Sequence, residues 1–256
     1  MIDKLTPLVR NAERLVASGY YGRPTEFPAS SKFGEALEHH RLFPIIAEVK
    51  LGSPSAGRLS PHSPERLLSE YFASGAAAIS VLTEPEHFGG SLDALASACG
   101  SGAPVLMKDF VVSERQIDAA AGLGASAVLL IQEIFGTAVA EGRRDELIDH
   151  AHRRGVEVLL EAGSAGTLEK AIASPADLLG INQRDLFSFA VDTGKAARLL
   201  PSVAGRGRPV VVMSGIADRK GVEKARDRGA DAVLVGGALA SSPEPGKALR
   251  SMAVGR

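Results

Sequence analysis

The sequence predicts an α/β fold in which eight parallel strands close into a (β/α)8 barrel, and three observations carry this prediction. Eight short runs rich in Val, Leu and Ile recur along the 256 residues, starting about 20 to 35 residues apart, the length of one βα unit. The runs are nearly continuous in apolar residues, as expected of parallel strands covered on both faces. Helix-like stretches separate them, and a chain of about 250 residues is ordinary for such a barrel.

The eight predicted strands share this apolar, β-branched character, and each ends near a polar residue or a glycine. In chain order they span residues 44–50, 78–83, 104–109, 127–132, 157–162, 178–184, 210–215 and 232–237.

The stretches between the strands carry helix signals. PERLLSEYFASG has apolar residues near helical spacing and ends in Gly75, and SERQIDAAAGLG opens with Ser113 as an N-cap. RDELIDHAHRRG and DRKGVEKARDRG follow the same scheme. Three strands are introduced by the similar phrases GAAAISV, GASAVLL and GADAVLV, which the packing of small residues between helix and strand explains as well as an internal duplication does.

The alternative arrangement is an open doubly wound sheet. If it bound a dinucleotide it would carry a G-x-G-x-x-G turn after the first strand, whereas residues 52–57 read GSPSAG. No long linker divides the chain, so we expect one domain: a (β/α)8 TIM barrel over 44–256. Residues 1–43 are expected to form a helical extension that covers the lower end of the barrel or flanks its mouth.

Composition excludes several functional classes. With 29 basic and 30 acidic residues the net charge is −1, so no global field attracts nucleic acid or anionic lipid. The single Cys99 rules out an internal disulfide and a cysteine-based metal cluster, and reads as a buried, inert thiol. The N-terminus carries acidic residues and does not resemble a signal peptide, and no apolar run approaches the length of a bilayer span. We therefore expect a cytoplasmic protein; the sequence does not identify a protein partner.

Charged and amide side chains stand at the ends of several predicted strands. In a barrel these ends meet at one mouth, where the chemistry of such folds takes place. One such Lys or Glu alone is more often half of a structural ion pair, but burying many of them together is costly unless they serve a ligand. The residues concerned are Glu48, Lys50, Lys108, Glu161, Asn182 and Arg184.

Small residues stand at the ends of the last two strands, as Ser214-Gly215 and Gly236-Gly237. Loops after the seventh and eighth strands of barrels often hold phosphate, because glycine lets backbone N–H groups approach its oxygens. Glycine pairs alone could be simple turns, but their occurrence at both strand ends predicts a phosphate site.

These residues belong to motifs that resemble those of the indole-3-glycerol-phosphate synthase family. IIAEVKLGSPSAG is similar to the pattern I-A-E-x-K-x-x-S-P-S-x-G of its first strand, and PVLMKDF to its third-strand motif. EVLLEA, GINQRDL, SGI and AVLVG follow in the family's order, so the resemblance runs from about Pro44 to Leu239. It implies closure of an indole ring on an anthranilate-bearing phosphosugar, with loss of carbon dioxide and water and without a metal or redox cofactor.

The resemblance also implies roles for the polar residues. Lys108 would be the general acid and Glu161 its counterpart in proton transfer. Lys50 would contact the substrate carboxylate, and Glu48 would hold the lysines in place. Asn182 and Arg184 would orient the substrate, and Ser53 would line the mouth. Phe88, Phe110 and Leu186 would make apolar contacts to the aromatic ring. The phosphate would be bound by Ser214, Gly215, Gly236 and Gly237.

Two positions depart from the family pattern. Where the family reads V-x-E-S-G-I, this chain has Met213 in place of the Glu, and Gly237 stands where Ser or Thr is common. Because Met213 removes an anionic acceptor, a second interpretation stays open: a barrel that binds the phosphosugar without converting it. A phosphate-binding isomerase is the other alternative, although the set of Lys50, Lys108 and Glu161 argues against it.

Overall fold

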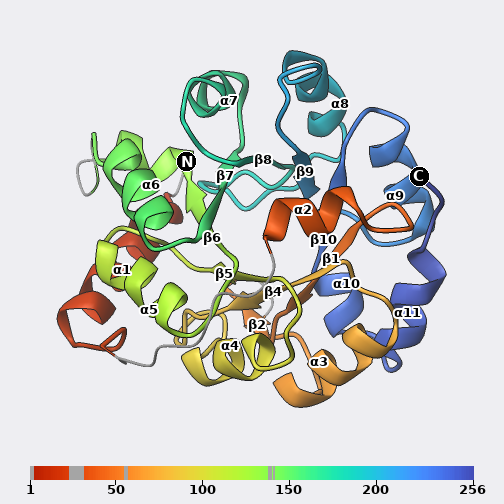
Figure 1. Cartoon of the computed structure of the whole chain (residues 1–256), viewed down its shortest axis with the longest axis horizontal. Helices are drawn as coiled ribbons and strands as arrows, with labels where there is room; N and C mark the ends of the chain where they lie inside the picture. The colour runs from red at the N-terminus through yellow and green to blue at the C-terminus, as the bar shows by residue number, and fades with distance from the viewer. Residues whose placement is uncertain (1–2, 23–31, 55–56, 138–139, 141) are drawn as a thin grey trace.

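The computed structural model describes residues 3–22, 32–54, 57–137, 140 and 142–256. Eight parallel strands form a closed barrel in the order β1-β10-β9-β8-β7-β6-β5-β4, and Figure 1 shows helices arranged around this ring. The predicted fold is confirmed, and each predicted strand overlaps one barrel strand. They are β1 (Ile45–Val49), β4 (Ala78–Leu82), β5 (Val105–Lys108), β6 (Ala127–Ile131), β7 (Glu157–Ala162), β8 (Leu178–Asn182), β9 (Val210–Met213) and β10 (Ala232–Val235).

The outer helices begin where the sequence supplies caps. Side chains of Ser63, Ser91, Ser113, Ser164 and Asp218 each accept a backbone N–H in the first turn of the helix that follows, which satisfies donors that a helix leaves unpaired. The barrel helices are α3 (Pro64–Ala73), α4 (Leu92–Cys99), α5 (Glu114–Gly122), α6 (Arg144–Arg153), α7 (Ala165–Ile172), α8 (Lys195–Leu199), α9 (Arg219–Arg226), α10 (Gly237–Ala240) and α11 (Pro245–Met252).

Four smaller elements lie in the loops. A short antiparallel pair, β2 (Gly52–Ser53) and β3 (Gly57–Arg58), follows β1. The 3-10 helices η1 (Gln132–Gly136) and η2 (Leu200–Ser202) follow β6 and α8.

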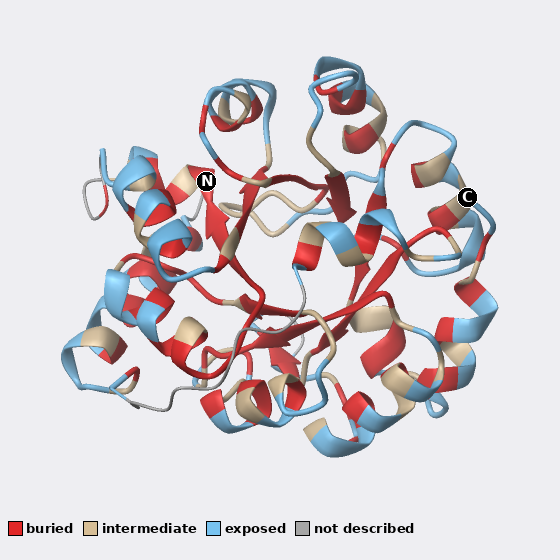
Figure 2. Cartoon of the chain, in the orientation of Figure 1, coloured by how far each residue is buried: buried red, intermediate tan, exposed pale blue. Residues whose placement is uncertain are grey.

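The strand register directs the polar strand ends into the barrel. Residues paired across parallel strands point to the same face of the sheet, and side chains alternate along each strand. Leu82 pairs with Lys108, Ile131 with Glu161 and Asn182 with Met213. The barrel strands are buried along almost their whole length (Figure 2), and the polar residues Glu48, Glu161 and Asn182 lie near their carboxyl ends.

Two helices before β1 contact opposite ends of the barrel. In Figure 1, α2 (Phe33–Glu38) lies in front of the barrel, at the end where the strands begin, and the backbone N–H groups of Phe33 and Gly34 donate to Glu157 at the start of β7. α1 (Leu5–Ala17) lies at the mouth, and Asn11 donates to Glu84 after β4. Both predicted positions of the extension are therefore occupied, one by each helix. Residues 1–2 and 23–31 of the extension lie outside the described residues, and the domain boundary at 43 stays a prediction.

Among the described residues, no helix combines the length and the apolar character that crossing a bilayer requires.

Candidate active site

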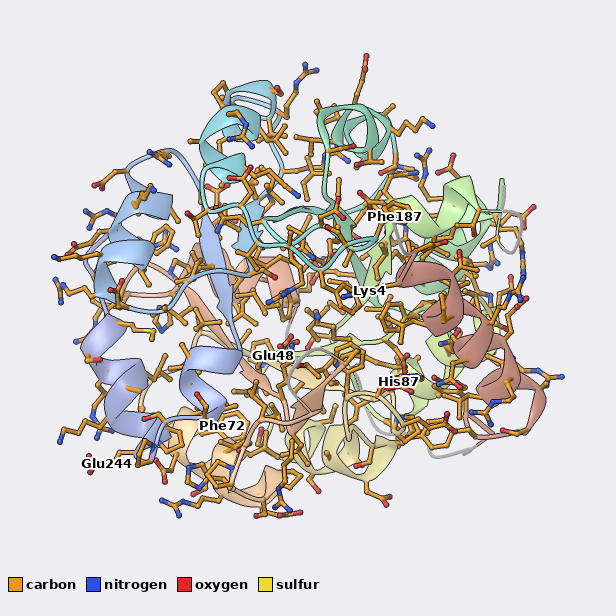
Figure 3. All side chains as sticks on the ribbon, turned by 180° about the vertical axis from the view of Figure 1, so that it is seen from behind. Lys4, Glu48, Phe72, His87, Phe187 and Glu244 are labelled. Carbon is orange, nitrogen blue, oxygen red and sulfur yellow. The ribbon has the colours of Figure 1, made fainter. Side chains whose placement is uncertain are left out.

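A cavity of about 460 Å³ opens at the carboxyl ends of the barrel strands. Figure 3 shows the barrel from this side, with Glu48 near its centre. All residues predicted from the sequence for the site line this one cavity, although their roles stay predictions. They are Glu48, Lys50, Ser53, Phe88, Lys108, Phe110, Glu161, Asn182, Arg184, Leu186, Met213, Ser214, Gly215, Gly236 and Gly237.

Glu48 lies between the two lysines of the mouth. Its Oε2 is 3.3 Å from Nζ of Lys108, and its Oε1 is 4.0 Å from Nζ of Lys50. A Cβ at Gly236 would lie 2.3 Å from Oε1 of Glu48. The carboxylate can therefore occupy this place only because residue 236 is a glycine, a steric role that the sequence analysis did not foresee.

The two lysines differ in their proton affinity. Burial lowers the pKa of Lys50 below its ordinary value, with Lys108 and Arg184 adding to the effect and Glu48 opposing it. Burial also acts against the charge of Lys108, but Glu48 and Glu161 outweigh it and the pKa of Lys108 is raised. Lys108 is thus the ammonium group held charged between two carboxylates, and Lys50 is the lysine that loses its proton more easily.

Glu161 is fully enclosed at the end of β7. Burial raises its pKa from 4.5 to about 7, against the opposing effects of Lys108 and of a hydrogen bond from Asn182. That hydrogen bond runs from Nδ2 of Asn182 to Oε1 of Glu161 at 2.6 Å. A carboxyl group with a pKa near neutrality can both accept and return a proton at physiological pH, which is what proton transfer in catalysis requires.

One wall of the cavity is aromatic. The rings of Phe88 and Phe110 lie 5.8 Å apart at 43°, and Nζ of Lys50 lies 5.5 Å above the ring of Phe88. Glu84 positions this wall because its buried carboxylate accepts the backbone N–H groups of Glu86, His87 and Phe88. A flat aromatic group bound here would stack beside a cation.

Glu84, Glu86 and His87 are also the one group among the described residues whose side chains could converge on a metal ion. Glu84, however, is occupied by the loop hydrogen bonds and by Asn11, and Glu86 is paired with Arg14. These contacts give the cluster a structural role: it holds the loop after β4 and joins it to α1.

The loop after β8 forms a second wall. Nη1 of Arg184 donates to the carbonyl of Phe189 at 2.8 Å, and Phe189 adopts φ 63°. Nζ of Lys4 lies 5.1 Å from the centre of the Phe189 ring, and the backbone N–H of Lys4 donates to Phe187. Figure 3 shows Lys4 and Phe187 close together at the mouth. The start of the chain thus supports the loop that carries Arg184.

The predicted phosphate residues lie together at the ends of β9 and β10. Ser214 and Gly215 have φ 67° and 73°, and Gln183 donates to the carbonyl of Ser214 at 2.7 Å. A Cβ at Gly215 would lie 2.8 Å from Val191, so this turn needs glycine. Around Gly237 the nearest atom to an added Cβ is 3.9 Å away, which leaves space beside the start of α10 for an anion.

Met213 occupies the position of the family's usual Glu. Only 2% of it is exposed, and a Cβ at Gly180 would lie 2.8 Å from its Cε and 3.2 Å from Cα of Glu161. The thioether therefore crosses β8 on the side of Glu161, and no carboxylate stands at this point.

Several apolar residues of the cavity were not among those predicted from the sequence. Ile131 lies within the predicted strand 127–132 and is the strand partner of Glu161, so the alternation of inward-facing residues along β6 could have identified it. Loop residues such as Phe189 carry no periodic signal. The missed residues are Pro54, Leu59, Ile131, Phe189, Ile216, Ala217, Leu234 and Ala238.

Sequence comparison with known proteins identifies the family. The sequence model of the indole-3-glycerol phosphate synthase family matches residues 20–252. The chain belongs to this family. The indole-3-glycerol phosphate synthase of Carboxydothermus hydrogenoformans is 40% identical over 207 residues, covering 80% of this chain and 77% of the relative. Indole-3-glycerol phosphate synthase 2 of Streptomyces coelicolor is 39% identical, covering 88% and 86%.

Solved structures support the fold alone. A thiamine phosphate pyrophosphorylase from Pyrococcus furiosus aligns with a TM-score of 0.60 at 16% identity, over 83% of this chain and 94% of that chain. An N-acetylmannosamine-6-phosphate 2-epimerase from Clostridium perfringens aligns with a TM-score of 0.62 at 17% identity, over 79% and 89%.

Proposed function

We propose that this member of the indole-3-glycerol phosphate synthase family closes the indole ring of 1-(2-carboxyphenylamino)-1-deoxyribulose 5-phosphate in tryptophan biosynthesis, a carboxy-lyase reaction. The observation that carries the proposal is the convergence of Lys108, Glu48 and Glu161 in a cavity that also holds an aromatic wall and a glycine-rich anion site. Family membership supports the same activity. Cytoplasmic location stays a prediction.

The substrate fits the cavity by charge and shape. Its aminobenzoate ring would pack against Phe88 and Phe110, with its carboxylate near Lys50. Its phosphate would lie at Ser214-Gly215 and beside Gly237, where the nearest atom to an added Cβ is 3.9 Å away and α10 begins. Arg184, in the loop after β8, would help to orient the substrate by attracting its negatively charged groups.

In the first step the ring carbon that bears the carboxylate attacks the ketone carbon, and Lys108 donates a proton to the ketone oxygen, which becomes a hydroxyl. The raised pKa of Lys108 keeps this proton available at neutral pH. Carbon dioxide then leaves, and the electron pair of its bond returns to the aromatic ring.

In the second step the hydroxyl takes a proton supplied by solvent and leaves as water. Glu161 accepts the proton released by the CH2 carbon beside the nitrogen, which completes the indole. Its pKa of about 7 suits this role, because a base is most effective when its pKa lies near the working pH.

Turnover of this substrate by the purified protein tests the proposal. Indole product together with loss of activity in Lys108→Ala would support it. Binding of a substrate analogue without any product would favour the non-catalytic barrel, for which Met213 is the one sequence feature.

A further inference from the structure

A carboxylate that the proposed mechanism does not use lies against the turn that follows Glu161. Glu133 lies in η1, two residues beyond Ile131, and Ile131 is the strand partner of Glu161. It is half-buried and is not among the residues that line the cavity. Its negative charge acts on Glu161 in the direction that raises the pKa of that group.

One oxygen of Glu133 holds the turn that follows Glu161. Oε1 accepts the backbone N–H of Gly163 at 2.7 Å and the hydroxyl of Thr167 at 2.8 Å. Thr167 in turn belongs to the capping box that starts α7. This oxygen therefore joins the end of β6 to the segment that leaves β7 just after the proposed base.

The other oxygen has no such role. Oε2 of Glu133 is buried and, within the described part of the chain, accepts no hydrogen bond. A buried, unpaired carboxylate oxygen is costly, because the charge is neither solvated nor neutralised by a donor. Structural clamping of Gly163 needs Oε1 alone, and an amide oxygen could provide it equally well. The charge itself remains unexplained by the clamp.

Charged side chains from several elements lie near Glu133 and Glu161. Lys108 and Glu48 act on Glu161 from β5 and β1. Nζ of Lys195, on α8, lies 3.8 Å from the position of a Cβ at Gly163, and Oε1 of Glu133 lies 3.2 Å from the same point. Lys195 therefore approaches the turn at Gly163 from the same side as Glu133, whereas Glu161 is fully enclosed.

We propose that Glu133 is a positioning residue that acts through Glu161: it fixes the turn after Glu161 and places a negative charge near that carboxylate, which strengthens Glu161 as a proton acceptor. The proposal rests on the assignment of the proton to Glu161. Like charges in a shared low-dielectric region favour protonation of one of them, and Glu161 is the more deeply buried of the two.

The decisive variant is Glu133→Gln, which keeps an oxygen for Gly163 and Thr167 and removes the charge. We expect the titration midpoint of Glu161, followed by NMR on protein with labelled glutamate side chains, to move to lower pH. The acidic limb of the kcat/KM profile should move with it, because the base then stays deprotonated further into acid. At its optimum, kcat should fall by about two- to tenfold, a small part of the loss expected on removing a general base.

Glu157→Gln is the matched control. Glu157 lies at the start of β7, the strand that carries Glu161 near its end, and it accepts two backbone N–H groups, from Phe33 and Gly34. This variant should leave both the midpoint of Glu161 and the pH profile unchanged. A purely structural role for Glu133 predicts the same of Glu133→Gln, with only Glu133→Ala showing an effect.

The outcomes separate the two claims. An unchanged midpoint of Glu161 in Glu133→Gln would overturn the proposal, whatever the rates. A shifted midpoint with an unchanged pH profile would show that Glu161 is not the base, which removes the assignment on which the proposal rests. Shifts of both together support it.

Discussion

The hydroxyl of Tyr21 donates to Oδ2 of Asp109 at 2.8 Å. Tyr21 lies in the segment between α1 and α2, and Asp109 directly follows Lys108 at the end of β5. Asp109 also accepts the backbone N–H of Phe110, so the contact ties the N-terminal segment to two residues of the cavity. Burial raises the pKa of Asp109 to about 6, which the bond from Tyr21 opposes by favouring the charged carboxylate.

Tyr21→Phe should therefore destabilise the protein by about 1 to 3 kcal/mol, the worth of a hydrogen bond to a buried carboxylate, because Oδ2 of Asp109 would keep only the hydroxyl of Thr83 as a donor. Denaturant unfolding at pH 8, where Asp109 is charged, measures the loss. Tyr71→Phe is the control. Tyr71 is also buried, but its hydroxyl lies 3.5 Å from the carbonyl oxygen of Glu48, which is a long and weak hydrogen bond. Equal losses in the two variants would show that the bond to Asp109 has no special weight.

Glu161→Gln should lower kcat by about 10²- to 10⁴-fold, as expected on loss of a proton-transfer group. The side-chain oxygen remains to accept from Asn182, so the fold should persist. A variant that keeps wild-type kcat would exclude Glu161 from the chemistry.

The same variant tests the cost of the buried charge. The native pKa of Glu161 is raised from 4.5 to about 7, so the native state holds its proton more tightly than the unfolded chain. The contribution of this group to stability is present below pH 4.5 and is lost as the pH rises through 7. Between pH 4.5 and 8, wild type should therefore lose more unfolding free energy than Glu161→Gln, by on the order of 1 to 3 kcal/mol. Parallel stability curves for the two proteins would contradict the raised pKa.

Sulfate or phosphate should bind at the turn formed by Ser214-Gly215 and at the start of α10. Gly215→Ala should weaken this binding, because the added Cβ would lie 2.8 Å from Val191 and the backbone has φ 73°. Crystals soaked in sulfate would reveal the anion, and a titration would compare its affinity in the two proteins. An anion bound elsewhere, with this turn empty at saturation, would refute the assignment.

Met213→Glu should raise kcat. A thioether is a weak acceptor that carries no charge, and the carboxylate would stand beside β8 near Glu161, where Gly180 leaves room for a long side chain. The expected gain is about 1 to 3 kcal/mol of transition-state stabilisation, the worth of one well-placed charged hydrogen bond. If the variant is no faster than an active wild type, Met213 is an accepted alternative to the Glu.

Sequence patterns predicted the barrel well because the signals for its strands and helix ends lie within short stretches of the chain. Apolar runs mark the strands, and Ser and Gly mark the helix ends. Parallel strands bring their carboxyl ends together, so the sequence alone predicts Lys108 and Glu161 at one mouth. The order of the strands in the barrel then follows from chain order.

The features that sequence could not predict depend on contacts between distant segments. Tyr21 and Asp109 are 88 residues apart, and no periodicity links them. The opposite pKa shifts of Lys50 and Lys108 arise from their burial and their neighbours, although both are lysines at strand ends. The steric need of Glu48 for Gly236 likewise appears only when β1 and β10 are paired.

The central claim is that Lys108 drives ring closure in this cavity, and indole fluorescence during turnover tests it most directly. The chain contains no Trp, so the product signal rises over a low protein background. Wild type should generate the signal, and Lys108→Ala, folded as judged by circular dichroism, should be slower by about 10²- to 10⁴-fold. Absence of product from wild type, or a variant that keeps more than about half of the wild-type kcat, would contradict the account.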